Sequence, residues 1–405
     1  MKKRIVLLLA VAVLTATFFG ASLKVWTVYK EDMAAYQALT LSIEQFEANT
    51  GHSVDIVSIP DQTDMDSKMQ IAAPTGMGPD VIATMPHDII GKWANQGILL
   101  ALNGKADMEP FFDSTIRAIT YEGKMYGFPL SVESVGLVYN KAFVPTAPQT
   151  FEEMIPVMER MEQDGLYGLV FPSAEPYHMY GILSGFGGYI FGWENDAYNV
   201  QDIGMNNEGA NEAIAYLKSF FERGLFPDSM RDRNTQHGFS TGTFEQGKAA
   251  FQINGPWVLA GLDAAGMDYG VAPIPVLPNG EYPHPFLGVQ FIGISAYSKN
   301  TPAAIALAEF LTGKEQMASY ALQTTLTPTR QDVLEDARIA QNEMIGAWAQ
   351  QASLGTPMPN IPEMSAVWSA WSDALQVIYF DRGTISETLD ELAETISEKI
   401  QIMRK

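Results

Sequence analysis

Isolated acidic and aromatic residues in turn-like contexts carry the most evident binding chemistry of this chain. The acids can accept hydrogen bonds from hydroxyl groups, and the rings offer flat faces to apolar C–H surfaces. A pyranose presents both kinds of surface, so the combination suits sugar binding. Each residue taken alone would be an ordinary core ring or a solvated acid. The candidates are Asp88, Glu133, Glu175, Tyr177, Trp257 and Trp368.

Motifs for other kinds of chemistry are missing or lack their structural context. Gly238 to Gly242 matches the G-x-S-x-G elbow of hydrolases, which needs a strand before the serine. The preceding residues 231–237 are polar, so we predict a loop and no nucleophile at Ser240. The five histidines never stand at zinc-hydrolase spacing, and no phosphate-binding loop occurs. We therefore expect no metal and no cofactor, and any ATPase must be a separate chain.

The elements that position these residues follow a β-α-β order. Strands are predicted at 24–28, 54–57 and 80–83, with helical spacing of apolar residues over 39–46 and a helix-like stretch through Trp93. This order predicts an α/β architecture. Further helices are predicted from the capping box at Thr150, over 207–223, over 301–313 and over the last twenty residues.

Length and composition indicate two folded lobes. The chain has 405 residues, of which 47% are hydrophobic and 18% are charged, and domains usually hold about 100–200 residues each. No low-complexity linker separates the lobes, so short crossovers must join them. The net charge of −22 disfavours nucleic acid and anionic membrane surfaces as partners.

The first residues have the pattern of a secretory signal. Three cations precede an apolar run over 5–21, which ends in a cluster of small residues, so we predict a signal peptide over 1–22. The chain contains no cysteine, which leaves no site for a disulfide or for an amino-terminal lipid anchor. A free periplasmic protein of a two-membrane bacterium is the expectation.

Several longer stretches resemble the maltose/maltodextrin-binding protein family, and the likeness covers nearly the whole mature chain. The resemblance implies a periplasmic-binding-protein fold of two α/β lobes, with a ligand cleft between them, several crossovers and hinge closure. The lobes are expected at 23–131 with 290–336, and at 135–286 with 342–405. The matching stretches are 78–82, His87-Asp88, 132–134 with 138–141, Glu175-Pro176-Tyr177, 187–189, Ile253-Asn254-Gly255-Pro256-Trp257 and 358–365.

The resemblance also assigns roles to individual positions. It places sugar-contacting acids at Asp88, Glu133 and Glu175, and stacking rings at Tyr177, Trp257 and Trp368. The family's N-terminal lysine falls on Lys30, although a one-residue shift would bring Tyr29 to the sugar instead.

The chain departs from the family pattern at several contacts. Ile89 stands in place of an arginine, and Ser369 and Ser372 replace a tyrosine and an arginine. A stacking tryptophan is missing before His87, and Trp371 is a local candidate to replace it. These departures leave the length of the ligand open.

The function implied by the resemblance is binding without catalysis. The protein would deliver maltose or malto-oligosaccharides to the membrane permease of an ABC importer that has separate ATPase subunits, and it would act as a monomer. One alternative keeps this role but changes the cargo to trehalose or another disaccharide or oligosaccharide. A more remote alternative is a glycoside hydrolase that uses Glu133 and Glu175 as its carboxylate pair.

Overall fold

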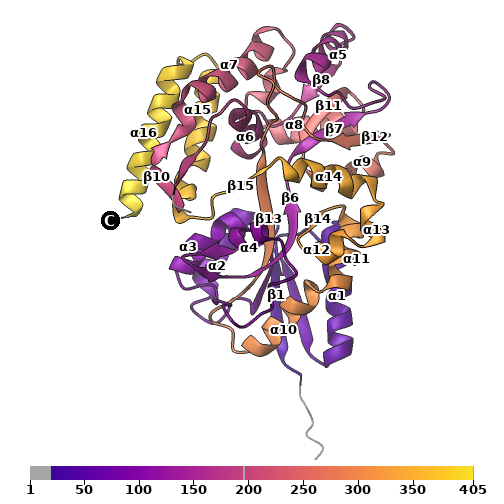
Figure 1. Ribbon diagram of the computed structural model, residues 1–405, viewed down its shortest axis with the longest axis vertical. Helices are drawn as coiled ribbons and strands as arrows, with labels where there is room; N and C mark the ends of the chain where they lie inside the picture. The colour runs from indigo at the N-terminus through magenta and orange to yellow at the C-terminus, as the bar shows by residue number, and fades with distance from the viewer. Residues whose placement is uncertain (1–19, 195–196, 405) are drawn as a thin grey trace, which may run out of the picture.

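Two β-sheets, one in each half of an elongated molecule, organise the computed structural model (Figure 1). The structure describes residues 20–194 and 197–404. The predicted signal peptide over 1–22 therefore lies almost entirely outside the described residues. Within the described ranges, none of the helices has the length and apolar character needed to span a lipid bilayer.

The first lobe is built on a mixed sheet in the order β14-β6-β13-β3-β1-β2, with β15 added beside β13. Strand β1 pairs in parallel with β2, from Ser22 opposite Ser53 to Thr27 opposite Ser58, whereas β13 runs antiparallel to β3 and β6. The strands are β1 (Ser22–Thr27), β2 (Ser53–Ser58), β3 (Val81–Pro86), β6 (Phe128–Glu133), β13 (Phe286–Ile294), β14 (Thr327–Pro328) and β15 (Thr356–Pro357). The short hairpin pairs β4 (Thr120–Tyr121) with β5 (Lys124–Met125).

Helices of the first lobe pack around this sheet (Figure 1). Helix α1 ends at Gly51, whose positive φ of 71° forms a left-handed cap that residues with a Cβ rarely adopt. The helical segments are α1 (Ala34–Thr50), α2 (Gln62–Ala72), η1 (His87–Ile89), α3 (Ile90–Asn95), α4 (Asp113–Ala118), α10 (Thr301–Leu311), α11 (Lys314–Thr324), α12 (Gln331–Leu334) and α13 (Ala337–Ala340).

The second lobe has a four-stranded sheet in the order β12-β7-β11-β8 and a separate hairpin of β9 and β10. The strands are β7 (Gly136–Asn140), β8 (Tyr167–Val170), β9 (Phe191–Glu194), β10 (Ala197–Ile203), β11 (Ala249–Asn254) and β12 (Tyr269–Ala272). The helical segments are α5 (Phe151–Gln163), α6 (Pro176–Gly185), η2 (Gly204–Asn206), α7 (Glu208–Glu222), η3 (Asp228–Met230), α8 (Gln236–Glu245), η4 (Pro256–Val258), α9 (Leu259–Ala264), α14 (Glu343–Ser353), η5 (Pro362–Ala366), α15 (Trp368–Tyr379) and α16 (Ile385–Met403).

The chain contributes in turn to two large buried clusters of apolar side chains, one in each lobe. One cluster draws on residues 23–130 and 289–326, and the other on residues 135–286 and 348–400. A smaller cluster joins Phe111 to residues between 317 and 345, among them Met317 and Val333. The prediction of two α/β lobes linked by several crossovers is confirmed.

Two local predictions illustrate how tertiary packing acts on the chain. The cap predicted at Thr150 forms, because its hydroxyl accepts the Glu153 N–H at 3.2 Å, but the Glu153 carboxylate accepts from Gln149 N at 2.7 Å. The predicted loop around Ser240 is wrong, since Gln236–Glu245 form helix α8. Phe244 and Ser240 of this helix are buried against the rest of the lobe, so burial compensates for its glycines.

Candidate ligand-binding site

A cavity of about 650 Å³ lies between the lobes. The first lobe contributes α2, η1, α3 and the ends of β3 and β6, and the second contributes α6, η4, η5 and α15. In open α/β sheets ligands bind outside the carboxyl ends of strands, and Asp88, Glu133 and Trp257 each lie at or just after such an end. The lining residues used below are Asp66, Asp88, Ile89, Lys92, Glu133, Glu175, Tyr177, His178, His237, Trp257, Gln290 and Trp368.

Six residues that the sequence predicts to bind ligand come together at this cavity. Three are the acids Asp88, Glu133 and Glu175, and three are the aromatic residues Tyr177, Trp257 and Trp368. Trp257 is 38% exposed, and its ring lies 6.1 Å from the Tyr177 ring, centroid to centroid. Acids from both lobes and aromatic residues of the second lobe therefore surround one space.

Two predicted residues do not line this cavity. Lys30 is exposed beyond the end of β1, and its neighbour Tyr29 is turned inward, with its hydroxyl 2.6 Å from that of Tyr320. Trp371 is fully buried and packs edge-on against Tyr180, at 6.3 Å between centroids. Helix α15 thus presents Trp368 to the cavity and directs Trp371 into the core, so Trp371 does not replace the missing stacking ring.

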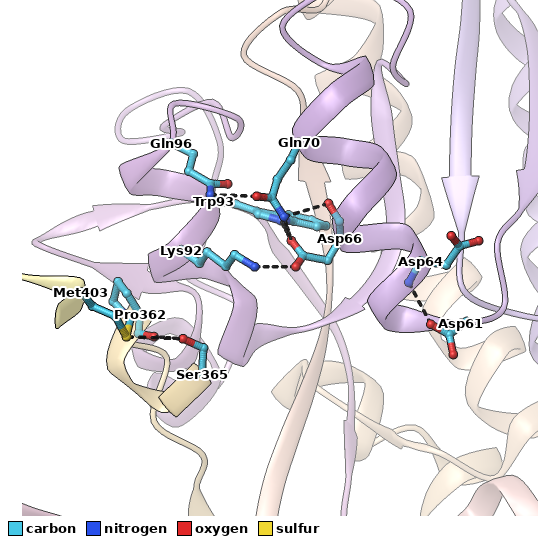
Figure 2. A network of polar contacts seen from close by, with 10 residues as sticks. All are labelled: Asp61, Asp64, Asp66, Gln70, Lys92, Trp93, Gln96, Pro362, Ser365 and Met403. Carbon is cyan, nitrogen blue, oxygen red and sulfur yellow. Dashed lines mark hydrogen bonds and ion pairs between the residues drawn. The ribbon is translucent and has the colours of Figure 1, made fainter. Parts of the chain in front are cut away.

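Sequence reasoning missed a charged pair on the cavity wall (Figure 2). Asp66 of α2 accepts hydrogen bonds from Lys92 Nζ at 2.5 Å and from Trp93 Nε1 at 2.8 Å, which fixes its carboxylate. Lys92 is the only lysine or arginine among the described residues that line the cavity. Lys92 lies three residues after Ile89, which is one helical turn further along, so the two side chains lie on the same face. This spacing was the signal that Lys92 could supply the cation that Ile89 lacks.

Burial changes the acidity of the cavity carboxyls. Desolvation raises the pKa of Asp88 to about 7, and hydrogen bonding to the backbone offsets only part of the rise. Desolvation also raises the pKa of Glu133 to about 7, against a 3.0 Å hydrogen bond from Gln290 Nε2. Burial acts in the same direction on Glu175, but its interactions with His178 outweigh it and the net pKa is lowered.

Tyr177 remains a neutral phenol at any physiological pH. Desolvation raises its pKa well above the ordinary value, and the nearby acids Glu133, Glu175 and Asp88 add to the rise. Its hydroxyl can therefore both donate and accept a hydrogen bond. Within the described ranges, no group of three or more His, Cys, Asp or Glu side chains is placed to hold a metal ion.

A larger cavity, of about 1140 Å³, is lined in part by residues 356–361. It shares Met358 and Ile361 with the first cavity, so this segment forms part of the wall of both. Its lining includes Arg117 and the exposed Trp193, but none of the residues predicted to bind ligand.

Relatives and solved structures match the chain along most of its length. Residues 42–374 match the family of bacterial extracellular solute-binding proteins. A galactooligosaccharide-binding protein of Bacillus subtilis (strain 168) is 32% identical over 386 residues, which cover 94% of this chain and 90% of the relative. The maltodextrin-binding protein MdxE of the same strain is 31% identical over 412 residues, with coverage of 96% and 97%.

The same likeness holds in three dimensions. The structure of a Thermus thermophilus maltotriose binding protein bound with maltotriose is similar at a TM-score of 0.85 and 27% identity. The similarity covers 93% of this chain and 100% of that one. With a family match over most of its length and relatives that align almost end to end, the chain belongs to the bacterial extracellular solute-binding proteins.

Proposed function

We propose that this protein is the sugar-binding component of an ABC importer and that it holds a malto-oligosaccharide in the interlobe cavity. The observation that carries the proposal is the meeting of three acids and three aromatic residues from both lobes around one space. Carboxylates and rings in this arrangement match the hydroxyls and C–H faces of pyranoses. The relatives named for maltodextrin and maltotriose support this choice of ligand.

Transport would depend on closure of the two lobes around the sugar. We assign the lobes to 23–131 with 290–336 and to 135–286 with 342–405, in line with the two buried clusters. Asp88 from the first lobe and Trp368 from the second both line the cavity, so one ligand can touch both lobes. A ligand that touches both sides stabilises the closed form, and the permease then recognises that form.

An alternative cargo would keep the same transport role. One relative is a galactooligosaccharide-binding protein, which keeps another oligosaccharide or a disaccharide such as trehalose as the alternative cargo. Ile89 supplies no cation to the site, whereas Lys92 brings an ammonium group to the same wall. The identity and length of the sugar are therefore to be measured against several candidates.

Binding without hydrolysis is the expected activity. A hydrolase would need one protonated and one ionised carboxyl, and the opposite pKa shifts of Glu133 and Glu175 resemble that division. The relatives are named for binding, however, and Glu175 is tied to His178 by two hydrogen bonds. A reducing-sugar assay on maltotetraose should show no release above that of an E133Q variant.

We further propose that the mature protein is a monomer, free in the periplasm, and that it works with a permease and separate ATPase subunits. The absence of cysteine from the sequence leaves no thiol for a lipid anchor. Fractionation of the host should place the protein in the periplasmic extract, and light scattering should give the monomer mass. Recovery with the membrane pellet after a salt wash would contradict the location.

Calorimetric titration of the mature protein tests the proposed function. The panel is maltose, maltotriose, maltotetraose, trehalose and a galactotriose, with glucose as the control. We expect micromolar or tighter binding to the malto-series, which corresponds to about −8 kcal/mol. Saturable binding of the galactotriose or trehalose alone would change the cargo, and no binding to any sugar would refute the proposal.

A further inference from the structure

His178 joins the acid Glu175 to the turn that carries Trp257. It follows Tyr177 in helix α6, is only 5% exposed, and lies on the wall of the interlobe cavity. No prediction from the sequence gave it a role. Its contacts reach from the start of α6 to the turn after β11, so it connects two segments that are far apart in the chain.

One oxygen of Glu175 is occupied by His178. Glu175 is the N-cap of α6, and its Oε2 accepts from the His178 backbone N–H at 3.0 Å and from His178 Nδ1 at 2.6 Å. In the described part of the chain, Oε1 receives no hydrogen bond, and the side chain remains 26% exposed at the cavity. The carboxylate is thus held by one oxygen, while the other is open to a ligand hydroxyl.

The imidazole itself is held at its other end. His178 Nε2 lies 3.3 Å from Asn254 Oδ1, and the backbone N–H of Gly255 donates to the same oxygen at 2.9 Å. This second donor fixes the Asn254 amide with its oxygen toward the histidine. The ring therefore has little freedom to rotate, and neither does the carboxylate that it holds.

The same ring also supports the stacking tryptophan. His178 meets Trp257 nearly edge-on, at 6.2 Å between ring centroids and 84° between ring planes. The ring of His237 packs against the ring of His178, at 5.4 Å between centroids. Edge-to-face contacts of this kind favour one ring orientation. The acid and the aromatic face of one sugar subsite thus depend on a single side chain.

We propose that His178 is a positioning residue, which orients the Glu175 carboxylate and backs the Trp257 ring for sugar binding. The inference rests on the proposed function and adds the means by which this side of the cavity is organised in advance. A site whose groups are fixed before the ligand arrives loses less conformational entropy on binding. Loss of His178 should therefore weaken binding although it need not touch the sugar.

The test is a double-mutant cycle read by calorimetry with maltotriose. His178→Phe keeps a ring beside Trp257 but removes the hydrogen bond to Glu175, and we expect maltotriose to bind about tenfold more weakly. His178→Asn restores an N–H near the position of Nδ1 and should recover at least half of that loss on a logarithmic scale. In the Glu175→Gln background, His178→Phe should cost less than about threefold, because the interaction it removes is already weakened.

The matched control is His284→Phe, since His284 also donates from a half-buried position, to Leu354 O at 2.8 Å, but does not line this cavity. It should lower the melting temperature and leave the affinity unchanged. Three results would overturn the inference. The fold-losses in affinity of His178→Phe and Glu175→Gln could simply multiply in the double variant, His178→Phe could keep the wild-type affinity, or His178→Asn could bind as weakly as His178→Phe. If His178→Phe fails to fold, the cycle is run with His178→Leu, which also removes the hydrogen bond to Glu175. A wild-type protein that binds no sugar refutes the proposed function itself, which is a separate outcome.

Discussion

Replacement of Trp257 by alanine should remove the main aromatic surface of the proposed sugar site. Trp257 is 38% exposed at the cavity, so a large part of its ring is free to meet a ligand, while the rest packs against Tyr177 and His178. Truncation of a central aromatic residue in an interface typically costs about 2 kcal/mol or more. A loss of about 2 kcal/mol corresponds to roughly 30-fold weaker binding of maltotriose.

A second variant moves the ring without removing it. A Cβ added to Gly255 would lie 2.1 Å from the Trp257 ring, so Gly255→Ala must displace the indole. Backbone strain is not involved, because Gly255 has a φ of −98°. We expect Gly255→Ala to weaken maltotriose binding by at least about fivefold, a cost of roughly 1 kcal/mol, although every side chain of the site is retained.

Titration calorimetry with maltotriose measures both effects, and circular dichroism checks the fold. Trp193→Ala is the matched control, because Trp193 is 54% exposed but lines the other cavity. Its affinity should stay within about twofold of wild type, a difference below roughly 0.5 kcal/mol. Wild-type affinity in Trp257→Ala, or an equal loss in Trp193→Ala, would refute the assignment of Trp257 as the stacking ring.

Three further outcomes follow from the charges and the packing. Asp88 and Glu133 have pKa values raised to about 7, and sugar hydroxyls donate best to ionised carboxylates. The affinity for maltotriose should therefore rise from pH 6 to pH 8, and binding should release protons, which calorimetry in two buffers measures. An affinity that falls as the pH rises would contradict this prediction. Lys92→Met should weaken maltotetraose binding by about tenfold, as expected for hydrogen bonds to a charged group. The control is Lys68→Met, which removes an exposed partner of Asp64 and should leave the affinity for maltotetraose unchanged. Equal effects of the two substitutions would exclude a contact between Lys92 and the sugar. Because Trp371 is fully buried, Trp371→Phe should destabilise the protein by about 1–2 kcal/mol in urea denaturation and leave the affinity for maltotriose unchanged. A fall in affinity would show that Trp371 is a binding residue.

The same raised pKa values predict how the stability of the ligand-free protein depends on pH. Between about pH 4 and pH 7 the folded state keeps protons on Asp88 and Glu133 that the unfolded chain has already lost. The free energy of unfolding should therefore fall as the pH rises through this range. Substitution of Glu133 by glutamine should reduce the slope, and urea denaturation at several pH values measures it.

Sequence patterns were sufficient for the α/β class and for many individual elements, because these depend on local periodicity and capping. The cap at Thr150, the amphipathic helix α7 and the last helix, α16, all form as predicted. Helix α8 did not follow its local pattern. Its two glycines and the polar residues 231–237 before it argued against a helix. Only the burial of Phe244 and Ser240 against the rest of the lobe accounts for the helix.

The amino-acid sequence by itself determined which chemical groups were available: acids and rings in turn-like motifs, no cysteine and a strongly negative charge. It could not decide which of two tryptophans three residues apart faces a ligand, and the packing of α15 placed Trp368 at the cavity and Trp371 in the core. Nor could it reveal Lys92 with Asp66, or His178 between Glu175 and Asn254. Asp66 and Lys92 come from separate segments of the first lobe, and His178 and Asn254 come from separate segments of the second. Their distances are set only when each lobe folds, since contacts between distant segments leave no local periodic signal.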